Sequence, residues 1–175
     1  MKIIPLTRGF VALVDDEDYE RVIAAGPWHA SSANDGCLYA VHSVVCKSDG
    51  THTTLRMHRF LLGITNPHVQ ADHINHDGLD NQRHNIRRCL HQQNQANSCK
   101  RPETTSRFRG VCWNKCHGKW EAKIKIDGKN IFLGYFADEI AAAHAYDAAA
   151  RELFGEFANP NFPDGSVNEQ ERNGY

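Results

Sequence analysis

The sequence predicts an α+β protein assembled from small units, and three observations support this class. Residues 119–126 alternate between polar and apolar side chains, which is typical of a strand with one buried face. An alanine-rich helix is expected from residue 138, directly after a further strand. A separate strand and helix are expected near the N-terminus. The length of 175 residues fits one domain or two small ones.

Changes in composition divide the chain into five segments. A mixed α/β unit is expected over residues 1–57, followed by a histidine-rich module over residues 58–97. Residues 98–106 lack apolar periodicity and contain one proline, so they are interpreted as a linker. A last module is expected over residues 107–163, and residues 164–175 form a polar tail that we expect to be frayed.

Local patterns predict the elements of the first segment. Residues 10–14 favour a strand, and the acidic residues 15–18 favour the start of a helix because carboxylates suit its positive end. Gly26 and Pro27 should stop that helix. The remaining expectation for this segment is a hairpin of strands 38–45 and 53–57 around the turn residues 48–50.

The overall composition excludes several classes of protein. Hydrophobic residues make up 41% and charged residues 23%, which is ordinary for a globular protein. No run of about 18 apolar residues is present, so no membrane partner is expected. The N-terminus lacks the apolar stretch of a signal peptide, which favours a cytoplasmic location. The six cysteines form no repeated CxxC pair and are interpreted as reduced thiols.

The net charge of −1 conceals a local basic region. Residues 107–136 carry seven Lys and Arg against two Asp and Glu, whereas residues 137–175 carry two against eight. A basic strip of this kind predicts a polyanionic partner, because phosphate contacts depend on charge within a Debye length. A solvated lysine-rich face explains the strip equally well until the pattern inside it is considered.

That pattern predicts a three-stranded antiparallel sheet covered on one face by a helix. Trp120, Ala122 and Ile124 should pack on a core, while the lysines between them point outward. Strands over residues 108–114 and 131–136 complete the sheet, and the helix should end before Gly155. The exposed face is therefore basic and partly aromatic, and such a β-ribbon can enter the major groove of DNA.

Five motifs in this module, in the same order, resemble the apetala/ethylene-response-factor (AP2/ERF-like) DNA-binding domain over residues 106–163. They are Arg109-Gly110-Val111, Gly118-Lys119-Trp120, Leu133-Gly134-Tyr135-Phe136, Ala145-Tyr146-Asp147-Ala148-Ala149 and Asn161-Phe162-Pro163. The resemblance implies that the sheet binds double-stranded DNA. It also implies that Arg109, Lys125 and Phe132 contact the DNA, with Phe132 in place of the usual Trp. Cys112 and Lys123 depart from the family pattern, so its target sequence is not carried over. The DNA-binding residues expected on this face are Arg107, Arg109, Trp113, Lys119, Lys123, Lys125 and Phe132; for Trp113, packing and base stacking are equally open.

Seven of the eleven histidines lie between residues 51 and 100. Within this region Asp72 and His73 are followed by Asn85, twelve residues after His73, and by Asn94, twenty-one residues after it. Asn94 lies in an expected short helix over residues 90–96. This spacing is similar to the HNH motif of phage-type homing endonucleases, which is a ββα-metal hairpin and helix. Such enzymes often carry an apetala-type domain behind the nuclease.

The HNH resemblance implies roles for four residues. His73 is the expected general base, since neutral imidazole is competent near pH 7. Asp72 and Asn94 are expected to hold one Mg²⁺, with Mn²⁺ as a possible substitute, because one carboxylate and one amide carry too little charge for two ions. Asn85 is expected to pin the loop between the strands. His58 recurs in the resembling proteins without an assigned role, and Arg87 and Arg88 either clamp phosphates or lie on the surface.

The leading hypothesis is therefore a Mg²⁺-dependent HNH DNA endonuclease of homing type and phage origin, acting in the host cytoplasm. A single active site predicts nicking by a monomer, and double-strand cleavage only through a dimer. One alternative is a non-catalytic DNA-binding regulator that keeps an inactive nuclease scaffold. RNA cleavage is disfavoured because a β-ribbon suits B-form DNA. A zinc site of His73, His76, Cys89 and Cys99 is disfavoured by the missing CxxC spacing.

Overall fold

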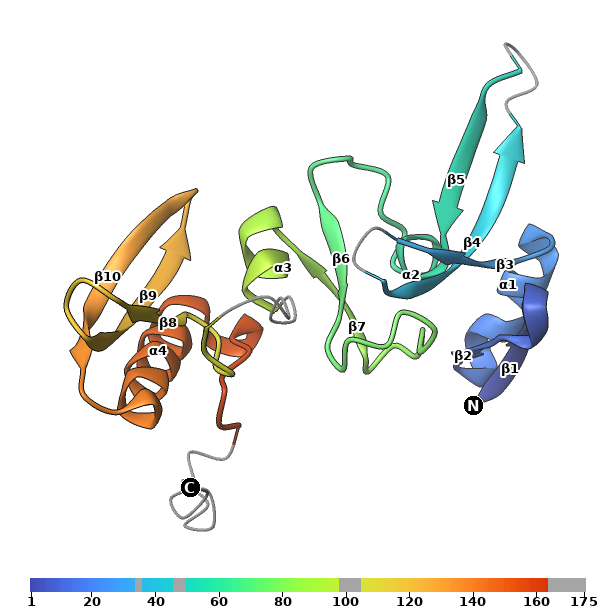
Figure 1. Ribbon diagram of the computed structural model, residues 1–175. Helices are drawn as coiled ribbons and strands as arrows, with labels where there is room; N and C mark the ends of the chain where they lie inside the picture. The colour runs from blue at the N-terminus through green and yellow to red at the C-terminus, as the bar shows by residue number, and fades with distance from the viewer. Residues whose placement is uncertain (34–35, 46–49, 98–104, 164–175) are drawn as a thin grey trace. The chain divides into compact units, whose positions relative to one another are not determined.

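The computed structural model describes residues 1–33, 36–45, 50–97 and 105–163. It divides into two compact units, Met1–Asn94 and Gln95–Tyr175, which are described separately. Several small antiparallel sheets and short helices make up the units, so the predicted α+β class is confirmed (Figure 1). Most of the expected turn 48–50 and of the linker 98–106, and the whole tail 164–175, lie outside the described residues.

Three antiparallel sheets form the N-terminal unit within its described residues. The first pairs β1 with β2, the second has the order β3-β4-β5, and the third pairs β6 with β7. The predicted pairing of residues 38–45 with the strand after residue 50 is confirmed, as β4 pairs with β5. The strands are β1 (Lys2–Pro5), β2 (Val11–Val14), β3 (His29–Ser32), β4 (Leu38–Val45), β5 (His52–Arg56), β6 (Gln70–His73) and β7 (Ile86–Cys89).

Short helices connect these strands. The helix expected after the acidic cluster is present, although it begins with a 3-10 turn, and Gly26 ends it with a φ of 122°. Met57 was expected to end a strand, but it begins a helix, and its fully buried side chain belongs to the core. The helices are η1 (Thr7–Gly9), η2 (Asp16–Asp18), α1 (Tyr19–Ala25), α2 (Met57–Leu61) and α3 (His91–Asn97), which runs across the division between the units.

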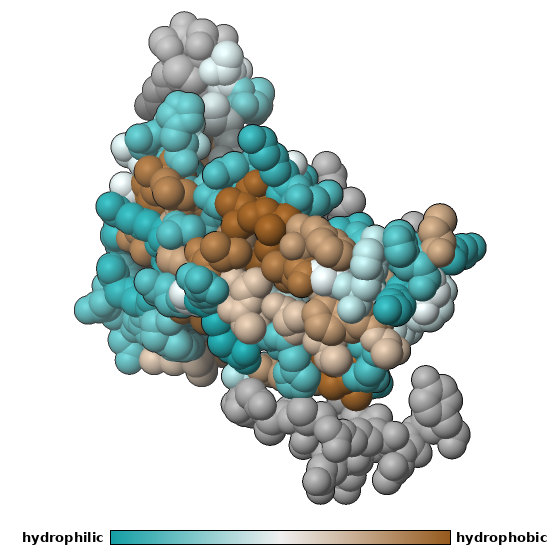
Figure 2. Space-filling view, turned by 90° about the vertical axis from the view of Figure 1, so that its left-hand side faces the viewer, coloured by the Kyte–Doolittle hydropathy of each residue, from teal (hydrophilic) through white to brown (hydrophobic). Residues whose placement is uncertain are grey.

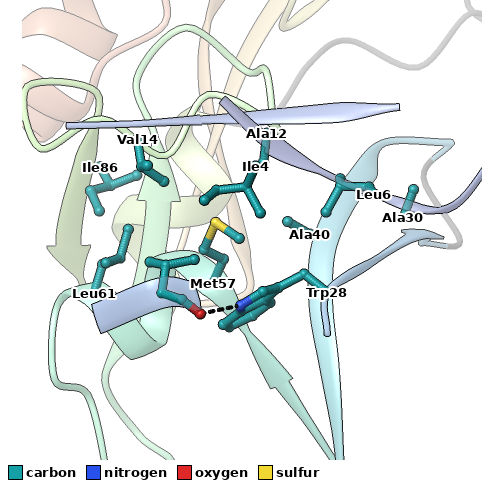
Figure 3. Packing of buried hydrophobic residues seen from close by; sticks show 11 residues of the cluster. Ile4, Leu6, Ala12, Val14, Trp28, Ala30, Ala40, Met57, Leu61 and Ile86 are labelled. Carbon is teal, nitrogen blue, oxygen red and sulfur yellow. Dashed lines mark hydrogen bonds between the residues drawn. The ribbon is translucent and has the colours of Figure 1, made fainter. Parts of the chain in front are cut away.

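One hydrophobic core joins the N-terminal hairpin, α2 and β7. Ile4 and Val14 pack with Met57 and Ile86 in this core (Figure 3). Trp28 closes one side, and its indole Nε1 donates a hydrogen bond of 2.9 Å to the backbone oxygen of Val22. Residues from the expected segments 1–57 and 58–97 thus share a single core, so the first segment supports the second directly.

The C-terminal unit has the predicted sheet and helix. Its strands lie in the order β10-β9-β8, and α4 lies against the sheet (Figure 1). The strand expected from residue 108 starts only at Val111, because Gly110 adopts a φ of 69° that interrupts the extended chain. The elements are β8 (Val111–Asn114), β9 (Lys119–Ile126), β10 (Lys129–Phe136), α4 (Glu139–Phe154) and η3 (Gly155–Phe157).

Small side chains and a cap explain the position of α4. Asp138 caps its N-terminus by accepting a hydrogen bond of 2.8 Å from the backbone nitrogen of Ala141. Ala142 and Ala143 are fully buried between the helix and the sheet, so the two approach closely. Buried Asp147 then accepts hydrogen bonds from the backbone nitrogens of Asn161 and Phe162, both 2.8 Å, which holds the following segment against the helix.

Candidate active site and nucleic-acid interface

The β6–β7 hairpin sets the directions of the predicted active-site residues. Asp72 lies opposite Arg87, and His73, the last residue of β6, lies opposite Ile86. Since side chains alternate along a strand, Gln70 and Asp72 share one face of the hairpin. His73 stands on the opposite side, where the strand leads into the loop before β7.

The buried carboxylate of Asp72 is paired with Arg87. Nε and Nη2 of Arg87 lie 3.0 and 2.9 Å from Oδ2 of Asp72, and the Asp72 side chain is only 6% exposed. Arg88, on the opposite face, donates instead to the backbone oxygen of Leu62. The sequence suggests the same two roles for both arginines, but their surroundings differ. Of the two, Arg87 is the one that contacts the candidate metal ligand.

Asn94 is connected to the Asp72 face through Gln70. The amide nitrogen of Asn94 donates a 2.8 Å hydrogen bond to Oε1 of Gln70. Nε2 of Gln70 in turn lies 3.0 Å from Nδ1 of His91, one turn earlier on α3. The hairpin and α3 are thereby linked by side chains, and Asn94 contacts a residue that lies on the same strand face as Asp72.

His73 packs against two aromatic rings. Its ring centroid is 4.7 Å from that of His58 in an edge-to-face arrangement, and 5.9 Å from that of Tyr39. His58 is 2% exposed, and within the described residues its Nδ1 has no hydrogen-bond partner. His58, the histidine without an assigned role, thus packs directly against the candidate general base.

Asn81 was not singled out from the sequence, yet it contacts His73. Its Oδ1 lies 3.3 Å from Nε2 of His73, and the residue is fully buried. Its amide nitrogen donates to the backbone oxygens of Leu79 at 3.0 Å and Gly78 at 3.4 Å. No local pattern separates Asn81 from the other polar residues of this loop, so sequence reasoning had no signal for it.

Asn85 connects distant parts of the same loop. Its Oδ1 accepts a 3.0 Å hydrogen bond from the backbone nitrogen of Asn75, and its Nδ2 donates a 2.7 Å bond to the backbone oxygen of Asp80. The loop is also attached to β2, because the backbone nitrogen of Asn81 donates to the oxygen of Leu13 at 2.8 Å. These bonds constrain the loop that supports His73.

Burial controls the charge of both histidines. It lowers the pKa of His73, against the opposing effects of the Asn81 hydrogen bond and of nearby acidic groups such as Asp72. Burial lowers the pKa of His58 well below its ordinary value, and the charges of His73, Arg56 and Arg59 act in the same direction. Both imidazoles are therefore neutral at pH 7.

Within the described part of the chain, no group of three or more His, Cys, Asp or Glu residues could hold a metal ion. Burial raises the pKa of Cys89 to about 11, so this thiol stays protonated at neutral pH and is a poor zinc ligand. Cys99 lies outside the described residues. What the site offers is the carboxylate of Asp72 and the carboxamide of Asn94, which suit a cation that prefers oxygen.

The outer face of the C-terminal sheet carries most of the predicted DNA-binding residues. Lys119, Lys125 and Arg107 are exposed. Lys123 lies on the same face, is half-buried and pairs with Glu121 at 3.4 Å. The half-buried guanidinium of Arg109 lies 6.0 Å from the ring centroid of Tyr146.

Aromatic side chains extend this face along β10. Phe132 is 55% exposed and contacts Tyr135, which stacks on His117 with ring centroids 4.4 Å apart. Trp113 was expected on this face, but it lies opposite Trp120 in the ladder of β8 and β9 and packs edge-on against it, so it is on the side of the sheet that faces α4 although it is 39% exposed. Figure 2 views the molecule from the side on which β10 lies in Figure 1, and an apolar band there is bordered by hydrophilic residues.

The comparisons with known proteins agree with this division of the chain. Residues 106–156 match the model of the AP2 domain. Over 66 residues the chain is 46% identical to APETALA2-like protein 2 of Oryza sativa subsp. indica, covering 37% of this chain and 15% of that protein. Over 62 residues it is 44% identical to dehydration-responsive element-binding protein 2A of the same plant, covering 34% of this chain and 22% of that protein.

A different relative extends beyond this domain. Over 112 residues the chain is 32% identical to the uncharacterized HNH endonuclease L560 of Acanthamoeba polyphaga mimivirus, covering 61% of this chain and 57% of that protein. The chain thus spans between a seventh and about half the length of these relatives. In the described residues, every helix is too short or too polar to span a bilayer.

Proposed function

We propose that this protein is a Mg²⁺-dependent HNH-type DNA endonuclease. In this proposal the N-terminal unit hydrolyses a phosphodiester bond, and the C-terminal unit holds the chain on double-stranded DNA. The observation that carries it is the arrangement at the end of β6. There, Asp72 and His73 are adjacent, and Asn94 of α3 is hydrogen-bonded to Gln70 on the Asp72 face. The similarity to an HNH endonuclease of mimivirus supports the same assignment.

The ligand chemistry of the site fits a magnesium ion. Asp72 would supply a carboxylate and Asn94 a carbonyl oxygen, and both are the hard ligands that Mg²⁺ prefers. The amide nitrogen of Asn94 is bonded to Gln70, which leaves its oxygen as the group for a cation. When bound, the ion would supply positive charge for the phosphate and the leaving 3′-oxygen. Only one carboxylate is offered, so we propose one ion rather than two.

His73 is the proposed general base. Because burial lowers its pKa, the ring is neutral at pH 7 and can take a proton from a water molecule. The water oxygen forms a bond to phosphorus, the bond from phosphorus to the 3′-oxygen breaks, and this oxygen takes up a proton from solvent. Asn85 supports the step by holding the loop that follows His73.

The C-terminal unit is the proposed anchor on DNA. Its AP2 match and its basic, aromatic sheet face support groove binding by β9 and β10, with Lys125 on phosphate or base and Phe132 against the bases. Two tethered units on one polymer raise the local concentration of the active site over nearby phosphates.

A plasmid-nicking experiment tests the enzyme. Supercoiled DNA incubated with the protein and Mg²⁺ should be converted to the open circular form, and EDTA should stop this conversion. His73→Ala should lower the rate by about 10² to 10⁴-fold, the range expected for a general base. His84→Ala is the matched control, because His84 is exposed in the same loop, and it should keep the wild-type rate.

Two results would contradict the proposal. Nicking that persists both in EDTA and in His73→Ala would exclude this mechanism. DNA retention that weakens with salt, without nicking under any divalent ion, would favour the non-catalytic DNA-binding regulator instead.

A further inference from the structure

We infer that Asn81 is a positioning residue that fixes the tautomer of His73, so that Nδ1 is the nitrogen that accepts the proton. This inference deepens the proposed function, because it names the reacting atom of the proposed base. It depends on the hydrogen bond between the two side chains and on the way in which Asn81 itself is held.

The orientation of the Asn81 amide is determined by its surroundings. Its nitrogen lies within hydrogen-bond distance of two backbone oxygens, those of Leu79 and Gly78, which can only accept. The reverse orientation would place the amide oxygen against these carbonyl oxygens inside a fully buried site. The side-chain oxygen of Asn81 is therefore the atom that faces His73, at 3.3 Å from Nε2.

This orientation decides which ring nitrogen carries the hydrogen. An amide oxygen can only accept, so Nε2 of His73 must be the donor. In a neutral imidazole with its hydrogen on Nε2, the in-plane lone pair belongs to Nδ1, which is then the basic atom. The pairing follows the general logic of an acid–base histidine whose second nitrogen is held by an orienting group.

The backbone makes this contact insensitive to local motion of the loop. The nitrogen of Asn81 donates to the oxygen of Leu13 on β2 at 2.8 Å, and the nitrogen of Leu13 donates to the oxygen of Leu79 at 2.9 Å. Asn81 is thus tied to the N-terminal hairpin, and that hairpin is part of the main core. The N-terminal sheet therefore helps to position His73, although it lies far from His73 in the sequence.

Nitrogen NMR of the wild-type protein tests the tautomer directly. With ¹⁵N-labelled histidine above the pKa of His73, Nε2 should give the signal of a protonated nitrogen and Nδ1 that of an unprotonated one. Comparison with His73→Gln identifies the signals. The opposite assignment, with hydrogen on Nδ1, overturns the inference, and this measurement requires neither DNA nor metal.

Substitution of Asn81 tests its role in the reaction. Asn81→Leu removes the acceptor and should lower kcat for nicking by about 10²-fold or more with an unchanged KM for DNA, because the ring loses its fixed tautomer. His84→Leu is the control, since His84 is an exposed residue of the same loop. A wild-type kcat in a folded Asn81→Leu protein contradicts the inference.

The two proposals fail in distinguishable ways. If the wild-type protein does not nick DNA, the proposed function fails, while the NMR signals still decide the tautomer. If it nicks DNA with Nε2 unprotonated, only the inference about Asn81 fails. If Asn81→Leu does not fold, as judged by circular dichroism, the wild-type NMR result alone decides the question.

Discussion

Asp72 and Arg87 face each other across the β6–β7 ladder, and Nε and Nη2 of the arginine both lie about 3 Å from one carboxylate oxygen. An isolated buried carboxylate is expensive because it loses its hydration. The guanidinium compensates for that loss in the protein without metal. The partner of the candidate metal ligand is therefore another residue of the hairpin, in direct register with it.

Removal of this arginine should destabilise the N-terminal unit. Arg87→Met leaves the Asp72 charge buried without its partner, and we expect a loss of about 3 kcal/mol in the free energy of unfolding. Urea denaturation in EDTA measures it. Arg88→Met, which removes only a bond to the backbone oxygen of Leu62, should lose about 1 kcal/mol. A double substitution with Asp72→Asn should lose less than the sum of its parts, and strict additivity would argue against the pairing.

Stability should fall in mild acid because two neutral histidines are buried. The folded pKa of His58 lies well below the ordinary value, so the unfolded chain binds a proton first as the pH falls through about 6.5. The stabilisation is complete above this pH and is lost below it, by up to about 1.4 kcal/mol per pH unit for each histidine. Urea denaturation at pH 7.5 and 5.5 checks this.

His58→Phe separates the contribution of His58 from that of His73. Phenylalanine keeps an aromatic ring against His73 and has no group to protonate, so the stability of this variant should depend less on pH. His84→Gln, a change at an exposed position, should behave like the wild type. An unchanged pH dependence in His58→Phe would show that burial of this ring does not control acid stability.

Gly110 should tolerate no side chain. It has a φ of 69°, and an added Cβ would overlap the ring of Tyr146 and lie 2.7 Å from the backbone oxygen of Lys123. Gly110→Ala should therefore lower the stability of the C-terminal unit by about 3 kcal/mol or more. Gly118 has a similar φ of 60° with open space around it, so Gly118→Ala should lose only about 1 kcal/mol. Equal thermal shifts in the two variants would exclude the packing argument.

The exposed lysine of β9 should contribute to DNA affinity through its charge. A phosphate contact by Lys125 predicts two effects of Lys125→Gln. Binding to duplexes of any sequence should weaken, and the magnitude of the slope of log K against log salt should fall by about 0.9. Fluorescence anisotropy over a salt series measures both quantities. Lys2→Gln removes the same charge from the N-terminal unit and should leave the slope nearly unchanged. A larger change of the salt slope in Lys2→Gln than in Lys125→Gln would place the main DNA contact on the N-terminal unit.

Much of the C-terminal unit could be predicted from the sequence because its signals are local. The alternation along β9 depends only on neighbouring residues, and so do the Asp138 cap and the glycine after α4. The start of β8 could not be predicted, since it depends on the close approach of Tyr146 to Gly110. The pairing of Lys123 with Glu121 on the same face of the strand was also not predicted.

The sequence by itself determined the sheet and helix of the C-terminal unit, its basic sheet face and the residue types of the candidate site, because periodicity and motif spacing are properties of the chain. Only the tertiary structure decided how those residues are held. Asn81 contacts His73 through a loop tied to β2, and Met57 begins a helix whose first side chain is buried in the core. Hydrogen-bond partners and burial depend on segments far apart in the sequence, and no local pattern encodes which of them will meet.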